Sequence, residues 1–194
     1  NYAVKKFPNN HSARIKRGLT FLSFNLPREA IEDFNKSLEF ATEDSLKLSS
    51  YINLSAAKSW KRDFEGAYED LQKAYKIDSL NIGILTNLAM VSDEVNRGSE
   101  TLGYLYKVLT IDSTYTPAYS NIGFKLQLMG EYKKSIEYFD KAINIDPNLA
   151  LAYSNRSYSK LMLKDVKGAL NDNCDCYNLH PRLRGHRAGA SDPY

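Results

Sequence analysis

The feature that most constrains this chain is an internal repeat of 34 residues. The tripeptides IDS, IDS, IDP and LHP begin at positions 77, 111, 145 and 179, so each starts 34 residues after the one before. The segments YINLS, LTNLA, YSNIG and YSNRS begin at positions 51, 85, 119 and 153, with the same step. A chain that repeats at this period is expected to fold as an array of similar small units that stack on their neighbours.

The repeat predicts an array over residues 11–181, with an N-terminal extension at 1–10 and a tail at 182–194. Its units are expected at 11–47, 48–81, 82–115, 116–149 and 150–183. The tail contains Gly185, Gly189 and Pro193 without apolar periodicity, so it is expected to be disordered. Two interpretations of the tail stay open, a non-native extension and a natural disordered terminus.

Each unit predicts a pair of antiparallel helices, and the fourth unit shows this most clearly. Tyr119, Ile122 and Leu126 recur at helical spacing and share one face. Gly130 interrupts that run, and a second apolar run follows. The second run ends before Pro147, because the residue that precedes a proline disfavours helix. The fold class is therefore predicted to be all-α.

Small residues occupy fixed places in each unit, at positions eight, twenty and twenty-seven, as Gly123, Ser135 and Ala142 do in the fourth. This pattern and the 34-residue period resemble the tetratricopeptide repeat (TPR) family. The resemblance implies an all-α TPR solenoid of about five antiparallel helix pairs wound as a right-handed superhelix. Two positions depart from the family pattern, Val108 in the third unit and Asn173, where an aromatic residue is expected, in the fifth.

The resemblance also implies a binding surface, because the first helix of each TPR unit lines a concave groove. Position six of four successive units is an asparagine: Asn53, Asn87, Asn121 and Asn155. These residues are similar to the asparagine ladders of TPR proteins that hold extended peptides, since a carboxamide both donates and accepts hydrogen bonds. The alternative is that each amide only bonds a neighbouring helix. Position nine is expected to line the same groove with apolar side chains, namely Met90, Phe124 and Tyr158.

Two further sequence features concern the groove. Trp60, the sole tryptophan, is interpreted either as an anchor for a partner or as a cover for the helical turn before Arg62. The clamp with which some TPR proteins hold a C-terminal carboxylate is absent, because Ile15 and Leu19 stand where that clamp needs lysine and asparagine.

Composition and motifs exclude several other functions. The 26 Lys and Arg residues against 23 Asp and Glu residues give a net charge of +3, and the last fifteen residues hold +2 of it, so nucleic acid is not an expected partner. No apolar run is long enough to span a membrane. No catalytic, phosphate-binding or metal-binding motif occurs, so an enzyme, a metal and a cofactor are not expected. Cys174 and Cys176 are too few for a disulfide framework.

The chain is therefore predicted to be a non-catalytic protein–protein interaction scaffold that presents an asparagine-lined groove to an extended peptide or a partner helix. One alternative is a structural module that self-associates through an uncapped fifth unit and forms a homo-oligomer. Another is the recognition arm of a longer enzyme. The compartment is not determined by the sequence: the cytoplasm is favoured, and export stays open because a removed signal peptide leaves no trace.

Overall fold

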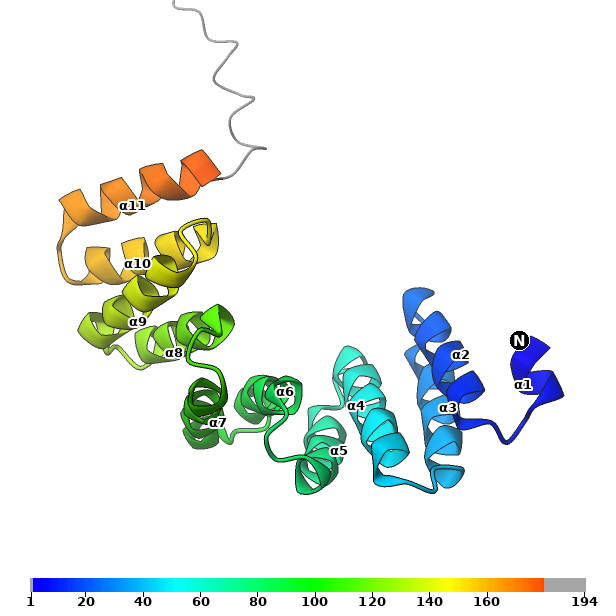
Figure 1. Ribbon diagram of the computed structural model, residues 1–194. Helices are drawn as coiled ribbons and strands as arrows, with labels where there is room; N and C mark the ends of the chain where they lie inside the picture. The colour runs from blue at the N-terminus through cyan, green and yellow to red at the C-terminus, as the bar shows by residue number, and fades with distance from the viewer. Residues whose placement is uncertain (1, 180–194) are drawn as a thin grey trace, which may run out of the picture. The chain divides into compact units, whose positions relative to one another are not determined.

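The computed structural model describes residues 2–179, and within that range the chain forms eleven helices and no strand. From the second helix onward, the helices form successive pairs, and the two helices of each pair run antiparallel to one another (Figure 1). The helices are α1 (Tyr2–Lys6), α2 (His11–Ser23), α3 (Pro27–Glu39), α4 (Asp44–Trp60), α5 (Phe64–Ile77), α6 (Ile82–Glu94), α7 (Gly98–Ile111), α8 (Thr116–Leu128), α9 (Tyr132–Ile145), α10 (Ala150–Met162) and α11 (Val166–Leu179).

The helices group into two compact units, one that ends at Ile111 and one that begins at Asp112. In the first unit α2 packs on α3, α4 on α5 and α6 on α7, and α3 and α5 also contact the helix that follows them. In the second unit α8 packs on α9, α9 on α10 and α10 on α11. The predicted all-α fold of helix pairs is confirmed. The expected tail at 182–194 lies outside the described residues, as do His180 and His186.

The turn inside each helix pair depends on a left-handed backbone conformation at one residue. Within the described residues, five have this conformation: Asn25, Arg62, Asn96, Gly130 and Lys164, with φ of 58°, 63°, 58°, 78° and 66°. The first two are 37 residues apart, and each later one follows the one before by 34 residues. Glycine adopts such angles without steric cost, and asparagine tolerates them better than most residues. Arg62 and Lys164 therefore hold these turns at an energetic cost.

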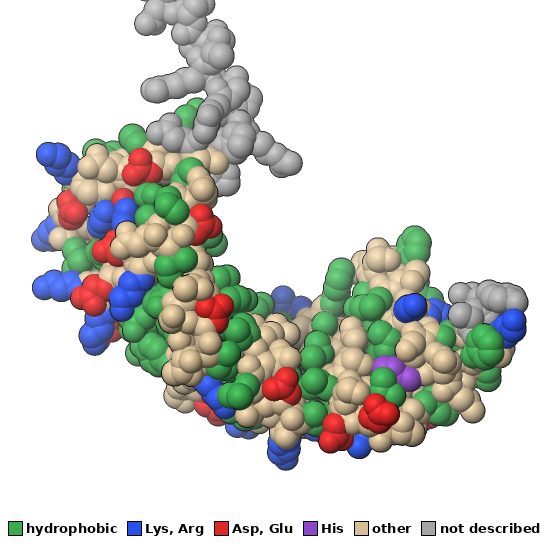
Figure 2. Space-filling model, in the orientation of Figure 1, with side chains coloured by type: hydrophobic (Ala, Val, Ile, Leu, Met, Phe, Trp, Pro, Cys, Tyr) green, Lys and Arg blue, Asp and Glu red, His purple; other side chains and the backbone are tan. Residues whose placement is uncertain are grey.

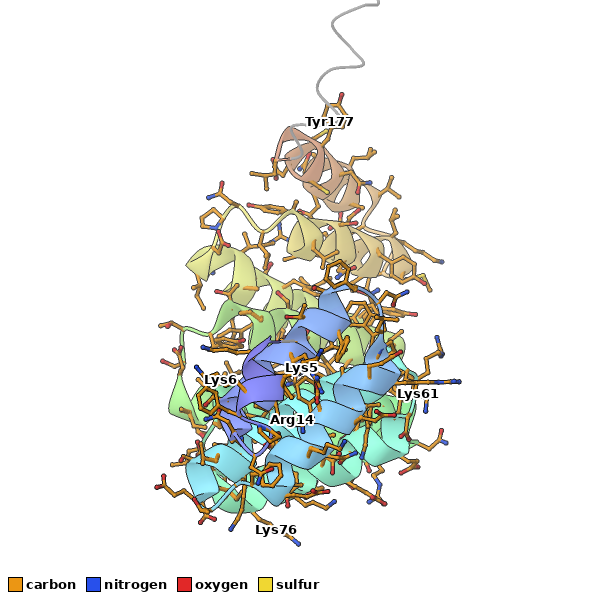
Figure 3. All side chains as sticks on the ribbon, turned by 90° about the vertical axis from the view of Figure 1, so that its right-hand side faces the viewer. Lys5, Lys6, Arg14, Lys61, Lys76 and Tyr177 are labelled. Atoms are coloured by element: carbon orange, nitrogen blue, oxygen red, sulfur yellow. The ribbon has the colours of Figure 1, made fainter. Side chains whose placement is uncertain are left out.

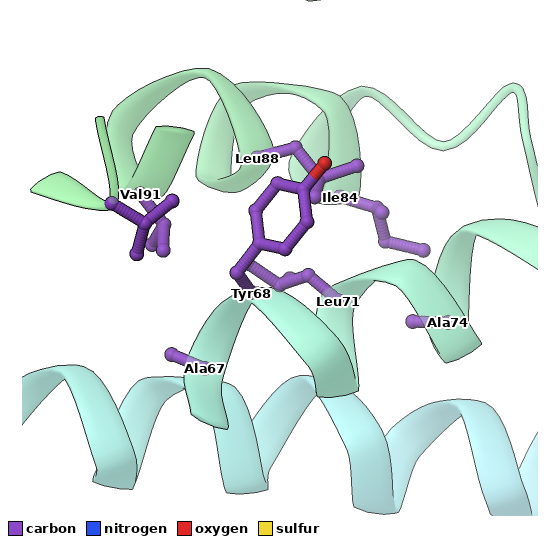
Figure 4. Close-up of a cluster of buried hydrophobic side chains, with 8 residues drawn as sticks. Ala67, Tyr68, Leu71, Ala74, Ile84, Leu88 and Val91 are labelled. Atoms are coloured by element: carbon purple, nitrogen blue, oxygen red, sulfur yellow. The ribbon is translucent and has the colours of Figure 1, made fainter. Parts of the chain in front are cut away.

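The core between the helices is built from small residues that face large ones. Phe34 and Phe139 are fully buried, and they lie against Gly18 and Gly123 of the preceding helix. In the first unit, Tyr68 and Leu71 of α5 face Leu88 of α6 in a continuous apolar cluster (Figure 4). Within each compact unit, neighbouring helix pairs complete one another's core, so stacking of successive pairs stabilises each unit.

Buried aspartates join the two helices of three pairs. Asp33 on α3 accepts hydrogen bonds from Arg14 and Arg17 on α2, at 2.9 Å from Arg14 Nη1 and 2.5 Å from Arg17 Nε. Asp70 is bonded in the same way to Lys58, and Asp172 to Arg156.

Some other basic side chains lie at the surface. Those of Lys61 and Lys76, for example, extend away from the helices (Figure 3). Buried charges need such partners, so the three aspartates fix how the helices of their own pairs pack.

Candidate functional site

The four asparagines of the predicted ladder lie near the middle of the first helix of their pairs. Asn53 is on α4 and Asn87 on α6, both within the first compact unit. Asn121 is on α8 and Asn155 on α10, both within the second. Asn121 is exposed, and the other three are partly buried. Each of these side chains is therefore reached from solvent.

The hydrogen bonds of these amides separate one asparagine from the other three. Asn53 Nδ2 donates to the carbonyl oxygen of Ser49 in its own helix, at 2.7 Å. Within the described part of the chain, the carboxamides of Asn87, Asn121 and Asn155 make no hydrogen bond. Polar groups of this kind bond either water or a ligand, and a carboxamide can pair with both the N–H and the C=O of a peptide backbone.

An exposed apolar side chain stands one turn after each of these three amides. Met90, Phe124 and Tyr158 are 65%, 45% and 49% exposed. Residues three apart on a helix share a face, so each apolar side chain lies beside an amide. On the face seen in Figure 2, green hydrophobic side chains are interspersed with tan atoms, which are the backbone and uncharged polar side chains. The surface offers apolar contact and neutral hydrogen bonding side by side.

A small pocket lies beside Asn87 in the first compact unit. Its volume is about 120 Å³, and Ala56, Ser59, Leu71 and Met90 are among the residues that line it. The lining comes from α4, α5 and α6, so the pocket is formed where two helix pairs stack. It has room for a small side chain next to the Asn87 amide.

A larger pocket lies beside Asn121 in the second compact unit, and we call it the α8–α10 pocket. Its volume is about 430 Å³, within the range of about 300–1,000 Å³ that holds small molecules. It is lined by the first two turns of α8, by the turn between α9 and α10, and by the start of α10. The lining residues are Thr116, Pro117, Ser120, Asn121, Asp146, Leu149 and Leu151.

Trp60 is exposed, with 57% of its surface accessible. Its Nε1 donates to Oδ1 of Asn25, at 3.0 Å, and Asn25 lies in the turn of the preceding helix pair. The indole is therefore held in place by one hydrogen bond while its ring stays open to solvent. Trp60 was predicted to cover the turn before Arg62 or to anchor a partner, and the structure adds a link to an earlier turn that no sequence pattern indicated.

The most strongly perturbed titratable group, Tyr68, belongs to a hydrogen-bonded cluster between α5 and α7. Tyr68 donates to Glu100 at 2.7 Å, and Gln72 donates to the hydroxyls of Tyr68 and Tyr104 at 3.0 and 2.8 Å. Burial, together with hydrogen bonds within this cluster, raises the pKa of Tyr68 well above its ordinary value. The hydrogen bond from Tyr68 lowers the pKa of Glu100. The cluster ties two helices together with its own members as partners.

The described histidine and cysteines lie apart from any cluster of metal-ligating side chains within residues 2–179. No group of three or more His, Cys, Asp or Glu side chains within residues 2–179 is placed to hold a metal ion. His11 Nε2 lies 3.0 Å from both the Leu46 carbonyl oxygen and Ser50 Oγ, which places the imidazole in the packing between α2 and α4. Cys174 and Cys176 are free thiols. Among the described helices, none has the length and apolarity needed to cross a membrane.

Comparison with known families identifies one repeat directly. Residues 116–149 match the family model of the tetratricopeptide repeat. The helix pair α8–α9, which carries Asn121 and Phe124, falls within that match. The chain therefore contains a tetratricopeptide repeat in this segment. No curated protein matches its sequence.

Solved structures show the same fold. A crystal structure of MamA protein superposes with a TM-score of 0.76 at 18% identity, covering 94% of this chain and 98% of that one. YrrB, described as a TPR protein with an unusual peptide-binding site, gives a TM-score of 0.70 at 20% identity, with 96% of both chains covered. MamA from Desulfovibrio magneticus RS-1 gives 0.76 at 16% identity, covering 93% of this chain and 97% of that one. The chain therefore shares its fold with these proteins.

Proposed function

We propose that this TPR protein is a non-catalytic scaffold that binds an extended peptide segment of a partner protein. The asparagine side chains of the first helices contact the peptide backbone, and the neighbouring apolar residues contact its side chains. This assignment agrees with the resemblance to YrrB, which is described as having a peptide-binding site. The function is proposed for the chain as an interaction module.

The observation that carries the proposal is the state of the three amides. Asn87, Asn121 and Asn155 make no hydrogen bond within the described residues, whereas structural amides in a packed array are normally bonded. Each has an exposed apolar neighbour, and two lie beside a pocket. Neutral amides recognise a backbone without regard to sequence, so the pockets and apolar residues supply the selectivity.

A pull-down from a lysate of the source organism tests the proposal. The wild-type chain is compared with the double variant Asn87→Ala/Asn121→Ala. We expect the double variant to lose most of the captured partner, because each lost hydrogen bond weakens binding by about 0.5–1.5 kcal/mol. Its thermal unfolding should match the wild type, since neither amide bonds the rest of the described chain.

Asn53→Ala is the matched control. Its amide already bonds its own helix, at 2.7 Å from the Ser49 carbonyl oxygen, so the substitution should leave partner capture unchanged. Equal capture by the wild type and the double variant would remove the asparagines from the mechanism. Equal loss in the control and the double variant would indicate a general effect of losing an asparagine.

A second candidate function is self-association through the last helix. Val166 and Leu170 of α11 are 56% and 59% exposed. In three preceding pairs, the second helix (α3, α5 or α9) packs against the helix that follows. A second copy of the chain is the partner that this candidate requires, and the oligomeric state decides it.

A further inference from the structure

We infer that the α8–α10 pocket receives an arginine side chain of the bound peptide. The inference rests on the proposed peptide-binding function and adds to it the chemistry of one side chain in the ligand. It depends on three properties of the pocket: its size, its apolar walls and a carboxylate that lacks a basic partner.

The walls and the volume favour a long side chain. Pro117, Leu149 and Leu151 form the apolar part of the lining, and Leu151 is 67% exposed. A volume of about 430 Å³ accommodates the three methylene groups of an arginine together with its planar head. The methylene stem can pack on the apolar walls while the charged head stays near polar groups.

The charge of the pocket favours a cation. Asp146 is the one charged residue in the lining, and no basic residue lines it. Asp146 forms no ion pair with another described residue. A negative site without a basic partner complements a positive side chain, and it disfavours an anionic one. An arginine can bond a carboxylate through two parallel N–H groups, which a lysine cannot do.

Asp146 accepts fewer hydrogen bonds than Asp78 and Asp112, the aspartates at the equivalent position of the two preceding repeats. Each of the three carboxylates accepts a hydrogen bond from the backbone N–H two residues further along the chain. The donors are Leu80 for Asp78, Thr114 for Asp112 and Asn148 for Asp146, at 3.2, 2.8 and 3.0 Å.

The two earlier aspartates also accept a hydrogen bond from a side chain. Asp78 accepts one from Asn81 Nδ2, at 3.2 Å, and Asp112 accepts one from Thr114 Oγ1, at 2.7 Å. Within the described residues Asp146 accepts no such side-chain bond. The turn therefore occupies only one hydrogen-bond acceptor site of the Asp146 carboxylate, and the other acceptor sites can bond a ligand.

Neutral acceptors lie around the same pocket. Asn121 Oδ1 makes no hydrogen bond within the described residues, and Thr116 also belongs to the lining. A guanidinium has five N–H donors, so it can bond Asp146 and a neutral acceptor at once. This combination selects arginine over an aromatic side chain, which fits the walls but offers at most one donor.

A titration with short capped peptides tests the inference. The probes are Ac-Ala-Arg-Ala-NH2 and its citrulline, norleucine and tryptophan counterparts, each added to the ¹⁵N-labelled full chain and followed by NMR. Citrulline has nearly the shape of arginine and no charge. We expect the arginine probe to shift the amide resonances of Asn121, Leu149 and Leu151. We also expect it to bind about fivefold more tightly than the citrulline probe, because one accessible ion pair contributes up to that factor.

Asp146→Asn and Asp78→Asn form a matched pair for the same titration. Both keep the side-chain oxygen that accepts the backbone N–H of the turn, and both are expected to melt as the wild type does. Asp146→Asn should reduce the affinity for the arginine probe to that for citrulline. Asp78 lies in the first compact unit, so Asp78→Asn should leave the affinity for the arginine probe unchanged.

The other outcomes overturn the inference. If the citrulline, norleucine or tryptophan probe binds as tightly as arginine, or if no probe shifts the pocket resonances, the pocket does not recognise a cation. Failure of the proposed peptide-binding function gives a different result from failure of this inference. If only the proposed function fails, the arginine probe still binds the pocket through Asp146, while the Asn87→Ala/Asn121→Ala variant captures its partner as the wild type does.

Discussion

At the scale of single residues, glycine has two opposite roles in this chain. At Gly123 an added Cβ would lie 2.8 Å from Cε1 of Phe139, a fully buried ring. At Gly103 an added Cβ would meet nothing within 4 Å, and the residue is exposed on α7. The first glycine permits close packing of two helices, and the second only weakens a helix.

Two alanine substitutions separate these roles. Gly123→Ala is expected to lower the free energy of unfolding by about 1–3 kcal/mol, because Phe139 must move within a packed core. Gly103→Ala is expected to raise it by about 0.5–1 kcal/mol, because alanine is the better helix former. Urea unfolding followed by circular dichroism measures both. A stabilising Gly123→Ala would show that the interface has room to spare.

Lys164 tests the cost of the left-handed turns. Its φ of 66° strains a residue with a Cβ atom, so Lys164→Gly is expected to raise the free energy of unfolding by about 0.5–1 kcal/mol. Lys167→Gly is the control. Lys167 lies three residues on, in the first turn of α11, where glycine should lower stability by a similar amount. Thermal unfolding of both variants and the wild type measures these changes in stability. If both substitutions destabilise the chain, the turn at Lys164 is not strained.

At the scale of helices, the buried aspartates determine how a pair packs. Asp33 is 1% exposed, and it bonds Arg14 and Arg17 across the α2–α3 interface. Burial alone would raise the pKa of Asp33, but the hydrogen bonds from Arg17 and Arg14 outweigh it, and the pKa is lowered from its ordinary value of 3.8. A lowered pKa means that the folded chain holds the ionised form more strongly than the unfolded chain does.

This lowered pKa predicts the pH dependence of one interaction. The stability from Asp33 is fully present above pH 3.8, the ordinary pKa, and is lost as the pH falls through the lower folded value. At pH 7 Asp33→Asn is expected to lower the free energy of unfolding by about 2 kcal/mol, since hydrogen bonds between charged groups are lost.

The pH series is followed by urea unfolding of both chains. The difference between the wild type and Asp33→Asn should shrink as the pH falls below 3.8, because the Asp33 carboxyl is protonated there in the unfolded chain and, at still lower pH, in the folded chain as well. Asp44→Asn, at an aspartate that is 74% exposed and pairs with Lys47, should change stability by less than about 0.5 kcal/mol at any pH. A constant Asp33 difference down to pH 2 would mean that packing, and not charge, is responsible.

At the scale of the whole molecule, the open question is self-association. Val166 and Leu170 expose apolar surface on α11, and a second copy is one way to cover it. If the chain self-associates there, Val166→Gln/Leu170→Gln should convert a concentration-dependent oligomer into a monomer in sedimentation equilibrium. Met129→Gln, also at an exposed apolar residue of the second unit, should not do so. A wild-type chain that is monomeric at all concentrations would leave peptide binding as the remaining candidate.

The sequence by itself predicted the helix pairs, the small residues of the interfaces and the asparagines of the first helices. These follow from local periodicity, because a 34-residue repeat places equivalent residues in equivalent environments. It also singled out Asn173, which is exposed in α11 where Phe139 is buried in α9.

Only the tertiary structure decided which members of a repeated set differ. Asn53 bonds its own helix whereas Asn87, Asn121 and Asn155 do not, and Asp146 lines a pocket with part of its carboxylate unbonded. The buried charges of Asp33, Asp70 and Asp172 were also not predicted. A one-dimensional repeat makes these residues look equivalent to their counterparts. What distinguishes them is the set of side chains that neighbouring helices bring within hydrogen-bonding distance, and that depends on how the helices pack in three dimensions.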